Sequence, residues 1–198
     1  MNFNMSEIDI QQSILSTIIN MFIARNWIDD NFDKYYNLIS KNNELFDLTT
    51  FENNDKKIVI KFYKFKLNTI KNDKEIETLI NTYSKYHKIL IVSDLTIKAN
   101  KQILDIQNFE VFKINEVIRD IAQHHLVPKH LLLSKEQTEQ VIDEYKLKKK
   151  DMGRIYIDDP MVKYLYAKKD DIIQIIRPSI YSGYSTYYRL VVNNSIYN

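Results

Sequence analysis

The first forty residues carry apolar side chains at helical spacing. One stripe consists of Ile10, Ile14, Ile18 and Phe22, widened by Leu15 and Ile19. This period predicts a helix that runs to about Arg25, opened by a pair resembling a capping box, Ser6 and Asp9. A second helix is predicted from about Asp30, and its inward face consists of Phe32, Tyr35, Tyr36 and Ile39. Trp27 is expected to anchor the intervening turn in the core.

Between residues 46 and 114 the pattern changes to short runs of β-branched and aromatic residues, separated by amphipathic segments. The predicted strands cover residues 46–51, 58–67, 88–92 and 109–114, and the predicted helices cover residues 73–86 and 96–105. The run at 88–92 is continuously apolar, as in a buried strand. Strands that alternate with helices at these lengths predict a small α/β domain with a partly parallel sheet.

A polar stretch at residues 115–125 predicts a boundary between two domains, residues 1–120 and residues 121–198. All three prolines and both glycines lie in the second domain, so its chain follows a tightly prescribed path. Helix starts are predicted at Ser134, which pairs with Gln137, and at Asp159, which precedes Pro160. The buried side of the first of these helices is expected to carry Val141, Ile142 and Tyr145.

The end of the second domain reads as two strands, at residues 172–176 and 187–192. The first is expected to end at Arg177 and Pro178, because proline cannot donate a hydrogen bond to a β-ladder. Gly183 lies between the strands, where a turn can require a positive φ. The second domain is therefore predicted to be a compact α+β unit.

Composition narrows the possible functions. Lys and Arg number 28 against 26 for Asp and Glu, so the net charge is only +2. A protein that binds nucleic acid by itself usually has a stronger basic bias, so DNA is not expected to supply the main binding energy. The chain has no cysteine, no membrane-spanning apolar run and no signal-peptide pattern at its start. Its richness in Ile, Lys, Asn and Tyr reflects AT-rich codons.

Candidate chemistry is sparse, and no catalytic residue, metal site or cofactor is predicted. His124, His125 and His130 lie close in sequence but lack the helical spacing of a paired zinc site, so a structural or interface role is favoured. With two glycines, thirty residues apart, neither a dinucleotide-binding nor a P-loop motif is possible.

A metal-dependent nuclease is an alternative for the first domain. A restriction-endonuclease-like site needs an Asp and then Glu-x-Lys on the next strand. Asp55 and Lys61 fit those places, but Val59 stands where the second acid is needed. A divalent cation would lack one of its carboxylates, so the site is expected to be inactive, with Lys61 facing solvent from a half-buried strand.

The C-terminal third contains the most specific pattern in the chain. HHLVPKHLLLSKEQ, RIYIDDPMVKYL and IIQIIRPSIYSGYSTYYRLV follow one another over residues 124–191. In order and spacing they closely resemble the small subunit shared by archaeal and eukaryotic multisubunit DNA-directed RNA polymerases, which is the fifth subunit of the nuclear enzymes. The resemblance implies the longer, two-domain form: an N-terminal α/β jaw domain with a nuclease-like fold but no active site, and a small C-terminal α+β assembly domain.

Three positions depart from the family pattern. Gly153 stands where the family has Pro, and Tyr166 and Asp170 stand where it has Gly. The geometry of those turns is therefore in question, although the fold is not.

The resemblance implies a non-catalytic subunit that docks on the largest polymerase subunit, assists assembly and contacts downstream duplex DNA, as one copy within a hetero-oligomer. The implied subunit interface comprises His130, Arg154, Asp159, Pro160, Arg177, Pro178, Gly183, Tyr188 and Arg189. For Arg177 and Arg189, salt bridges inside the domain are the alternative. The DNA-proximal residues are Thr96, Lys98 and Lys101, with a solvated helix start as the alternative.

The biased composition and diverged jaw suggest a large DNA virus that encodes its own polymerase, which predicts the host cytoplasm and the virion as locations. The rival is an AT-rich protist, with a nuclear location. A stand-alone DNA-binding regulator remains, beside the nuclease, as an alternative function.

Overall fold

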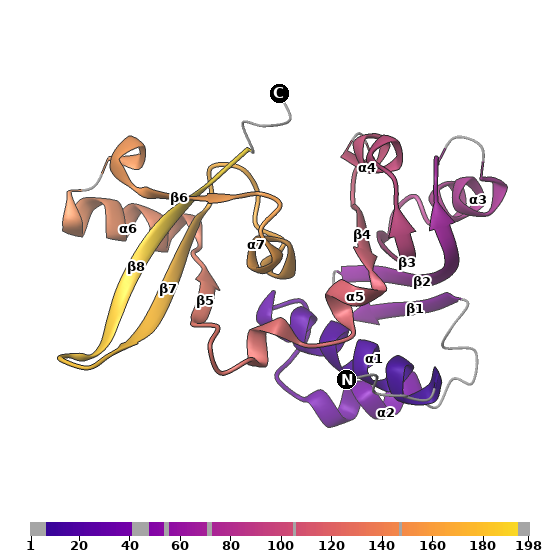
Figure 1. The fold of residues 1–198 in the computed structure, drawn as a ribbon, viewed down its shortest axis with the longest axis horizontal. Coiled ribbons are helices and arrows are strands. Elements are labelled where there is room, and N and C mark those ends of the chain that lie inside the picture. Colours follow the sequence, from indigo (N-terminus) through magenta and orange to yellow (C-terminus); the bar gives the residue numbers. More distant parts are fainter. Residues whose placement is uncertain are drawn as a thin grey trace. The chain divides into compact units, whose positions relative to one another are not determined.

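The computed structural model describes residues 7–40, 48–53, 56–70, 73–104, 106–146 and 148–193. The chain divides into two compact units, Met1–Arg119 and Asp120–Asn198 (Figure 1). In the described segments no helix is both long and apolar enough to cross a membrane.

The first unit is built on a four-stranded sheet with the order β1-β2-β3-β4. Its strands are β1 (Leu48–Asn53), β2 (Lys56–Leu67), β3 (His87–Leu95) and β4 (Phe109–Lys113). β1 is antiparallel to β2, whereas β2, β3 and β4 are mutually parallel. The predicted partly parallel sheet is confirmed, because the helices between β2, β3 and β4 provide the crossovers that parallel strands require.

Helices cover both faces of this sheet: α1 (Glu7–Ala24) and α2 (Phe32–Ser40) on one face, and α3 (Lys74–Thr82) and α4 (Ile97–Leu104) on the other (Figure 1). The short helix α5 (Ile114–Val117) follows β4. The α3–α4 side packs Ile76, Leu79, Ala99 and Ile103 on Val59, Leu90 and Val92 of the sheet. On the opposite face, the alternate residues Ile58, Ile60, Ile89 and Ile91 are buried. Strand β3 is thus buried on both faces, as the continuously apolar run at residues 88–92 predicts.

The local signals place most element ends correctly. Asp73 caps α3 by accepting hydrogen bonds from the N–H groups of Glu75 and Ile76. That helix ends at Thr82, four residues before the predicted end, and Tyr83 is its C-cap. Ser6 and residues 46–47, on which the first helix start and the start of β1 were predicted, lie outside the described residues.

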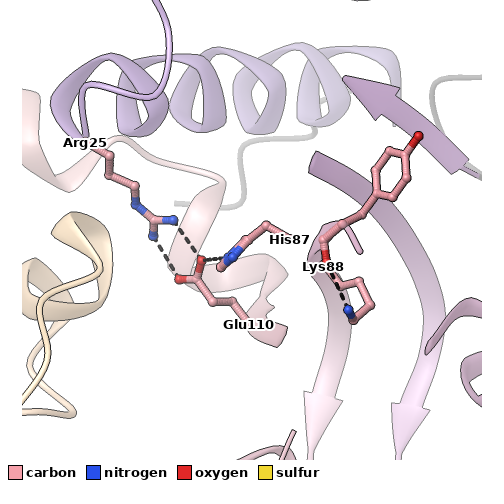
Figure 2. Close-up of polar contacts among 5 residues, drawn as sticks. Arg25, His87, Lys88 and Glu110 are labelled. Carbon is pink, nitrogen blue, oxygen red and sulfur yellow. Dashed lines mark hydrogen bonds and ion pairs between the residues drawn. The ribbon is translucent and has the colours of Figure 1, made fainter. Parts of the chain in front are cut away.

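A buried polar cluster fastens the end of α1 to the sheet (Figure 2). The Arg25 guanidinium donates from both terminal nitrogens to the two Glu110 carboxylate oxygens, at 2.8 and 2.9 Å. His87 Nε2 lies 2.5 Å from Glu110 Oε1. The half-buried Trp27 ring packs on Arg25 and His87. Its centre lies 4.7 Å from the Arg25 guanidinium carbon and 4.7 Å from the centre of the His87 ring. Trp27 therefore anchors the turn through its contacts with the Arg25 guanidinium and the His87 ring and through its stacking on Phe22.

Electrostatics explain why this cluster can be buried. The Arg25 and Glu110 side chains are only 1% and 11% exposed. Burial by itself raises the pKa of Glu110, but the charge of Arg25 and the hydrogen bonds from His87 and Arg25 outweigh it and hold that pKa below its usual value. Beside the cluster, the buried Lys88 ammonium donates to the carbonyls of Tyr83 and Tyr86, which follow α3, and burial lowers the pKa of Lys88.

The second unit is built on a four-stranded sheet with the order β5-β7-β8-β6. Its strands are β5 (Lys129–Leu132), β6 (Gly153–Tyr156), β7 (Ile172–Ser179) and β8 (Gly183–Val192), and its helices are α6 (Lys135–Tyr145) and α7 (Pro160–Leu165). Short 3₁₀ turns occur at Ile121–Gln123 and Lys149–Asp151. β7 pairs antiparallel with β5 and β8, while β6 runs parallel to β8. The expected mixed α+β unit is confirmed.

Both predicted helix starts in this unit are confirmed. Ser134 and Gln137 form a reciprocal capping box at the start of α6. Asp159 caps α7, accepting from the Met161 N–H at 2.8 Å, and Pro160 is the first residue of that helix. The predicted buried side of α6 is wrong in part, because Tyr145 is 55% exposed, and α6 contains no fully buried residue. Val141 and Ile142 are half-buried.

The predicted end of β7 at Pro178 is also wrong, since the strand continues to Ser179. The Leu133 N–H donates to the Ile172 carbonyl, so even-numbered residues of β7 turn their backbone groups towards the β5 side. Pro178 shares that parity, and β5 pairs only as far as Ile176. Its missing N–H therefore faces an open edge, where proline removes no ladder bond.

The positions where the family pattern has glycine keep the backbone that glycine favours. Tyr166 has φ 55° and Asp170 has φ 72°, both in the left-handed region. Tyr166 is the C-cap of α7, and its N–H bonds to the carbonyls of Lys163 and Val162. The turns are therefore formed without glycine, at the cost of strain at each residue.

We expect Asp170→Gly to raise the free energy of unfolding by about 0.5–1 kcal/mol, because relief of the positive φ outweighs glycine's extra chain entropy. Asp170 is exposed, and its N–H bond to Val191 is a backbone contact that the change preserves. Urea unfolding followed by far-UV circular dichroism measures the shift. Lys169→Gly is the control: this neighbour has no positive φ and is expected to lose stability instead. Loss of stability in Asp170→Gly would contradict the assignment of strain.

Candidate docking surface in the C-terminal unit

The β7–β8 hairpin extends beyond its neighbouring strands (Figure 1). The pairing of β7 with β8 continues to Ser179 opposite Gly183. β5 pairs with β7 only up to Ile176, and β6 pairs with β8 only from Arg189 onwards. Residues 177–188 therefore form a two-stranded projection, here called the arm. Gly183 turns the chain with φ 73°, and since a Cβ there would meet nothing within 4 Å, the backbone angle is what favours glycine.

The arm exposes large apolar side chains. Ile180, Tyr181, Tyr184 and Tyr187 are 99%, 100%, 72% and 49% exposed. A two-stranded hairpin is at best marginally stable alone, and a concentration of exposed apolar groups marks an interaction site. None of these four residues was in the predicted interface. The available signal was that apolar residues fall in the turn SIYSGYS itself, where solvent-exposed turns are normally polar.

The register separates the predicted interface residues onto two faces of the sheet. Ile175 pairs with His130 and Tyr187, Ile173 pairs with Arg189, and Arg177 shares their parity on β7. His130, Arg177 and Arg189 therefore lie on one face with Tyr187. Pro178, Tyr188 and Arg154 lie on the other face, because Arg154 pairs with Leu190. Tyr188 is also covered by α6, where the Tyr145 ring lies 5.9 Å away, and burial raises its pKa.

Arg177 and Arg189 make no ion pair with any described residue. The Arg177 guanidinium stacks over Tyr187, 5.1 Å from the ring centre. Arg189 donates from Nη1 to the Arg154 carbonyl at 3.4 Å. Gly153 lies beside Arg189, since a Cβ atom added to Gly153 would lie 3.7 Å from Arg189 Cγ. Both cationic groups therefore keep donors for a partner's acceptors.

Other predicted interface residues have roles inside the unit. The Asp159 carboxylate caps α7, and Pro160 begins it. His130 Nδ1 lies 2.7 Å from the Pro128 carbonyl oxygen, and the His124 and His125 rings lie 4.7 Å apart. No group of three or more potential His, Asp or Glu metal ligands occurs among the described residues.

In the first unit, the geometry around Lys61 differs from the prediction. Lys61 does not face solvent: its side chain is largely buried and its ammonium lies 2.5 Å from Glu75 Oε1. Val59, which occupies the place of the missing acid, is fully buried in the α3–α4 core. Asp55 lies outside the described residues.

The predicted DNA-proximal residues lie around the start of α4, at the carboxyl ends of the parallel strands. Thr96 Oγ1 donates to the Asn68 carbonyl and accepts from the Ala99 N–H, so it caps the helix. Lys98 and Lys101 are exposed and three residues apart, on one helix face. The same sheet edge carries Lys66 and Lys113, both bound to Asp94 at 2.8 and 3.1 Å.

These last lysines were not predicted. They could have been found from the predicted topology, because the carboxyl ends of adjacent parallel strands meet at one edge of a sheet, and Lys66 and Lys113 lie near the ends of two such strands. The Lys66 and Lys113 ammonium groups hold the pKa of Asp94 below its usual range, Lys66 contributing most. Two cations share one anion, so this edge stays positive.

Comparison with known proteins places these features in a family. A model of the RNA polymerase Rpb5 C-terminal domain matches residues 119–191. DNA-directed RNA polymerase subunit 5 of Acanthamoeba polyphaga mimivirus is 31% identical over 196 residues, which cover 94% of each chain. DNA-directed RNA polymerase subunit Rpo5 of Methanocaldococcus jannaschii is 38% identical over 76 residues, 38% of this chain and 97% of the relative.

A third relative, the rpabc1 subunit of DNA-directed RNA polymerases I, II and III of Dictyostelium discoideum, is 37% identical over 83 residues, 42% of each chain. The archaeal relative matches about the length of the second unit alone, whereas the viral relative also matches the first unit. With both units matched by one relative at this identity, the chain belongs to the family of DNA-directed RNA polymerase subunit 5.

Proposed function

We propose that this protein is a non-catalytic subunit of a DNA-directed RNA polymerase. Its C-terminal unit, residues 121–198 with Asp120 at the junction, is the assembly domain that docks on the largest subunit. Its N-terminal unit is a jaw domain beside the incoming downstream DNA. The observation that carries the proposal is the arm, whose exposed apolar side chains lie in the segment matched by the family model.

The arm has the composition of a binding hot spot. Tyrosine and arginine are enriched at the centres of protein interfaces, because each adds a large contact area and a polar group that a partner can satisfy. Here Arg177 is already stacked on Tyr187, so little side-chain freedom is lost on docking. His130 and Arg189 lie on the same face and extend the surface towards β5 and β6.

The jaw role rests on the basic edge of the first unit. Lys98 and Lys101 can reach phosphates, and Lys66 and Lys113 add charge beside them. Such contacts are independent of base sequence and weaken as salt rises. The net charge of +2 makes free DNA binding weak, so the polymerase itself is the source of correct positioning.

Catalysis is assigned to other subunits of the complex. A nuclease needs a second carboxylate beside Lys61, and Val59 supplies a buried methyl pair instead, while Lys61 is engaged by Glu75. The similarity to a mimivirus subunit favours a viral polymerase, in the host cytoplasm and the virion, over a nuclear one.

Affinity purification of the tagged full-length chain under gentle lysis tests the function. The two largest polymerase subunits are expected to co-purify in near-equal amounts with the tagged chain. Photo-crosslinking of the recovered complex to downstream duplex DNA is expected to label the region of Lys98 and Lys101. Recovery of the free monomer alone would overturn the proposal. So would Mg²⁺-dependent DNA cleavage by the pure chain that is abolished by Lys61→Ala.

A further inference from the structure

The two long edges of the arm differ in how they are protected. On the β7 side, the edge carries Arg177 and Pro178, the two kinds of residue that natural sheets use to prevent further pairing. On the β8 side, the sequence YSTYY (residues 184–188) has no charge and no proline, and it is rich in residues that favour strands. One edge is thus blocked, and the other is suited to accept a strand.

Hydrogen bonds at the base of the hairpin determine which backbone groups face that open edge. The Ile157 N–H donates to the Val192 carbonyl, and the Val191 N–H donates to the Asp171 carbonyl on the β7 side. Even-numbered residues of β8 therefore direct their N–H and C=O groups away from β7. Within residues 183–187 these are Tyr184 and Thr186, which pair with Pro178 and Ile176 across the ladder.

These outward groups lie next to no other strand of the described chain, because β6 pairs with β8 only from Arg189 onwards. The Tyr184 carbonyl accepts a hydrogen bond from the Ser182 hydroxyl. The side chains of Tyr184 and Thr186 are both exposed. The open stretch, residues 183–187, has about the length of an average strand.

Charge indicates what kind of segment fits. Residues 172–198 contain two arginines and no acidic residue, and both arginines lie on the Tyr187 face of the sheet. On the opposite face the open edge carries Tyr184. A strand lying along this edge would therefore place acidic side chains near Arg177 and Arg189, and apolar side chains beside Tyr184.

We propose that β8 accepts an extended segment of another polymerase subunit as a fifth strand, by backbone pairing along residues 183–187, and that this segment alternates acidic and apolar residues. The inference rests on the proposed function and specifies how the docking occurs. Backbone hydrogen bonds supply affinity in this mode, and the alternating side chains supply specificity.

Thr186→Pro tests the pairing. The Thr186 N–H faces the open edge, so its removal deletes no β7–β8 bond, as native Pro178 already illustrates on the other strand. Thr186→Val is the matched control, because it retains the N–H and the strand preference. We expect Thr186→Pro to reduce recovery of the polymerase subunits at least tenfold, with circular dichroism unchanged, and Thr186→Val to behave as the wild type.

Hydrogen exchange supplies a readout that a folding defect does not imitate. In the free chain, the Tyr184 and Thr186 amides are expected to exchange fast, while the Ser185 and Tyr187 amides, which face β7, are protected. In the purified polymerase all four become protected. Wild-type chain that co-purifies while Thr186 remains unprotected would overturn the inference and leave the proposed function intact.

Two other results would overturn the proposed strand addition. Failure of the wild type to co-purify would remove the proposed function and the inference together. Protection of Thr186 in the isolated chain, with a dimer in size-exclusion chromatography, would identify a second copy of this chain as the occupant and overturn the inference.

Discussion

Glu110→Ala is expected to lower the free energy of unfolding of the N-terminal unit by about 3–5 kcal/mol, because it leaves the Arg25 charge buried without its partner. The alanine also removes the acceptor of the His87 hydrogen bond. Trp27 is the single tryptophan of the chain and lies against Arg25, so its fluorescence during urea unfolding reports on this unit.

Two further variants separate ion-pair loss from ordinary truncation. Glu52→Ala breaks the exposed pair with Lys57 in the same unit, and its loss is expected to be much smaller, because water screens that pair. Arg25→Met combined with Glu110→Leu removes both charges and is expected to recover most of the stability. Equal losses in Glu110→Ala and Glu52→Ala would show that the buried cluster does not fasten α1 to the sheet.

Replacing Ile180 and Tyr181 together by serine is expected to leave the stability of the free chain unchanged and to abolish assembly with the polymerase. Both side chains are almost fully exposed, so the isolated fold loses no contact. Truncating an interface hot spot typically weakens binding by about 2 kcal/mol or more, roughly thirtyfold for each residue. Urea unfolding measures the first expectation, and the yield of co-purified large subunits measures the second.

Phe65→Ser is the matched control, since Phe65 is a similarly exposed large apolar residue in the N-terminal unit. It is expected to co-purify with polymerase subunits as the wild type does. Wild-type recovery by the Ile180 and Tyr181 double variant would exclude the arm tip from the docking surface. Equal loss in the Phe65 variant would indicate that any exposed apolar change disturbs assembly.

Much of the fold was predictable because its signals are local. Helical periodicity placed α1 and α3, capping residues placed the starts of α6 and α7, and alternation of strands with helices predicted the parallel pairing of β2, β3 and β4. The four-residue strands β5 and β6 were not predicted, since segments this short contain too little alternation. Tyr145 was placed in the core because periodicity identifies an apolar face of a helix but not how deeply that face packs.

The candidate site was predicted less completely. Spacing over residues 124–191 identified the family and several surface residues, among them Arg177 and Arg189. It did not separate Asp159, which caps a helix, from residues available to a partner. It also missed Ile180 and Tyr181, because neither belongs to the family pattern, although apolar residues inside a turn were a signal for an exposed patch.

Residues close together in the chain were enough to predict most of the helices and strands and the family pattern. Three other features exist only in the folded molecule. Arg25 meets Glu110 across 85 positions of sequence. The strand register brings His130, Arg177 and Arg189 to one face of the sheet. The arm is open only because β5 and β6 stop where they do. Each of these features depends on which distant segments pair and on where that pairing ends. Both are determined by packing between segments that are far apart in the sequence.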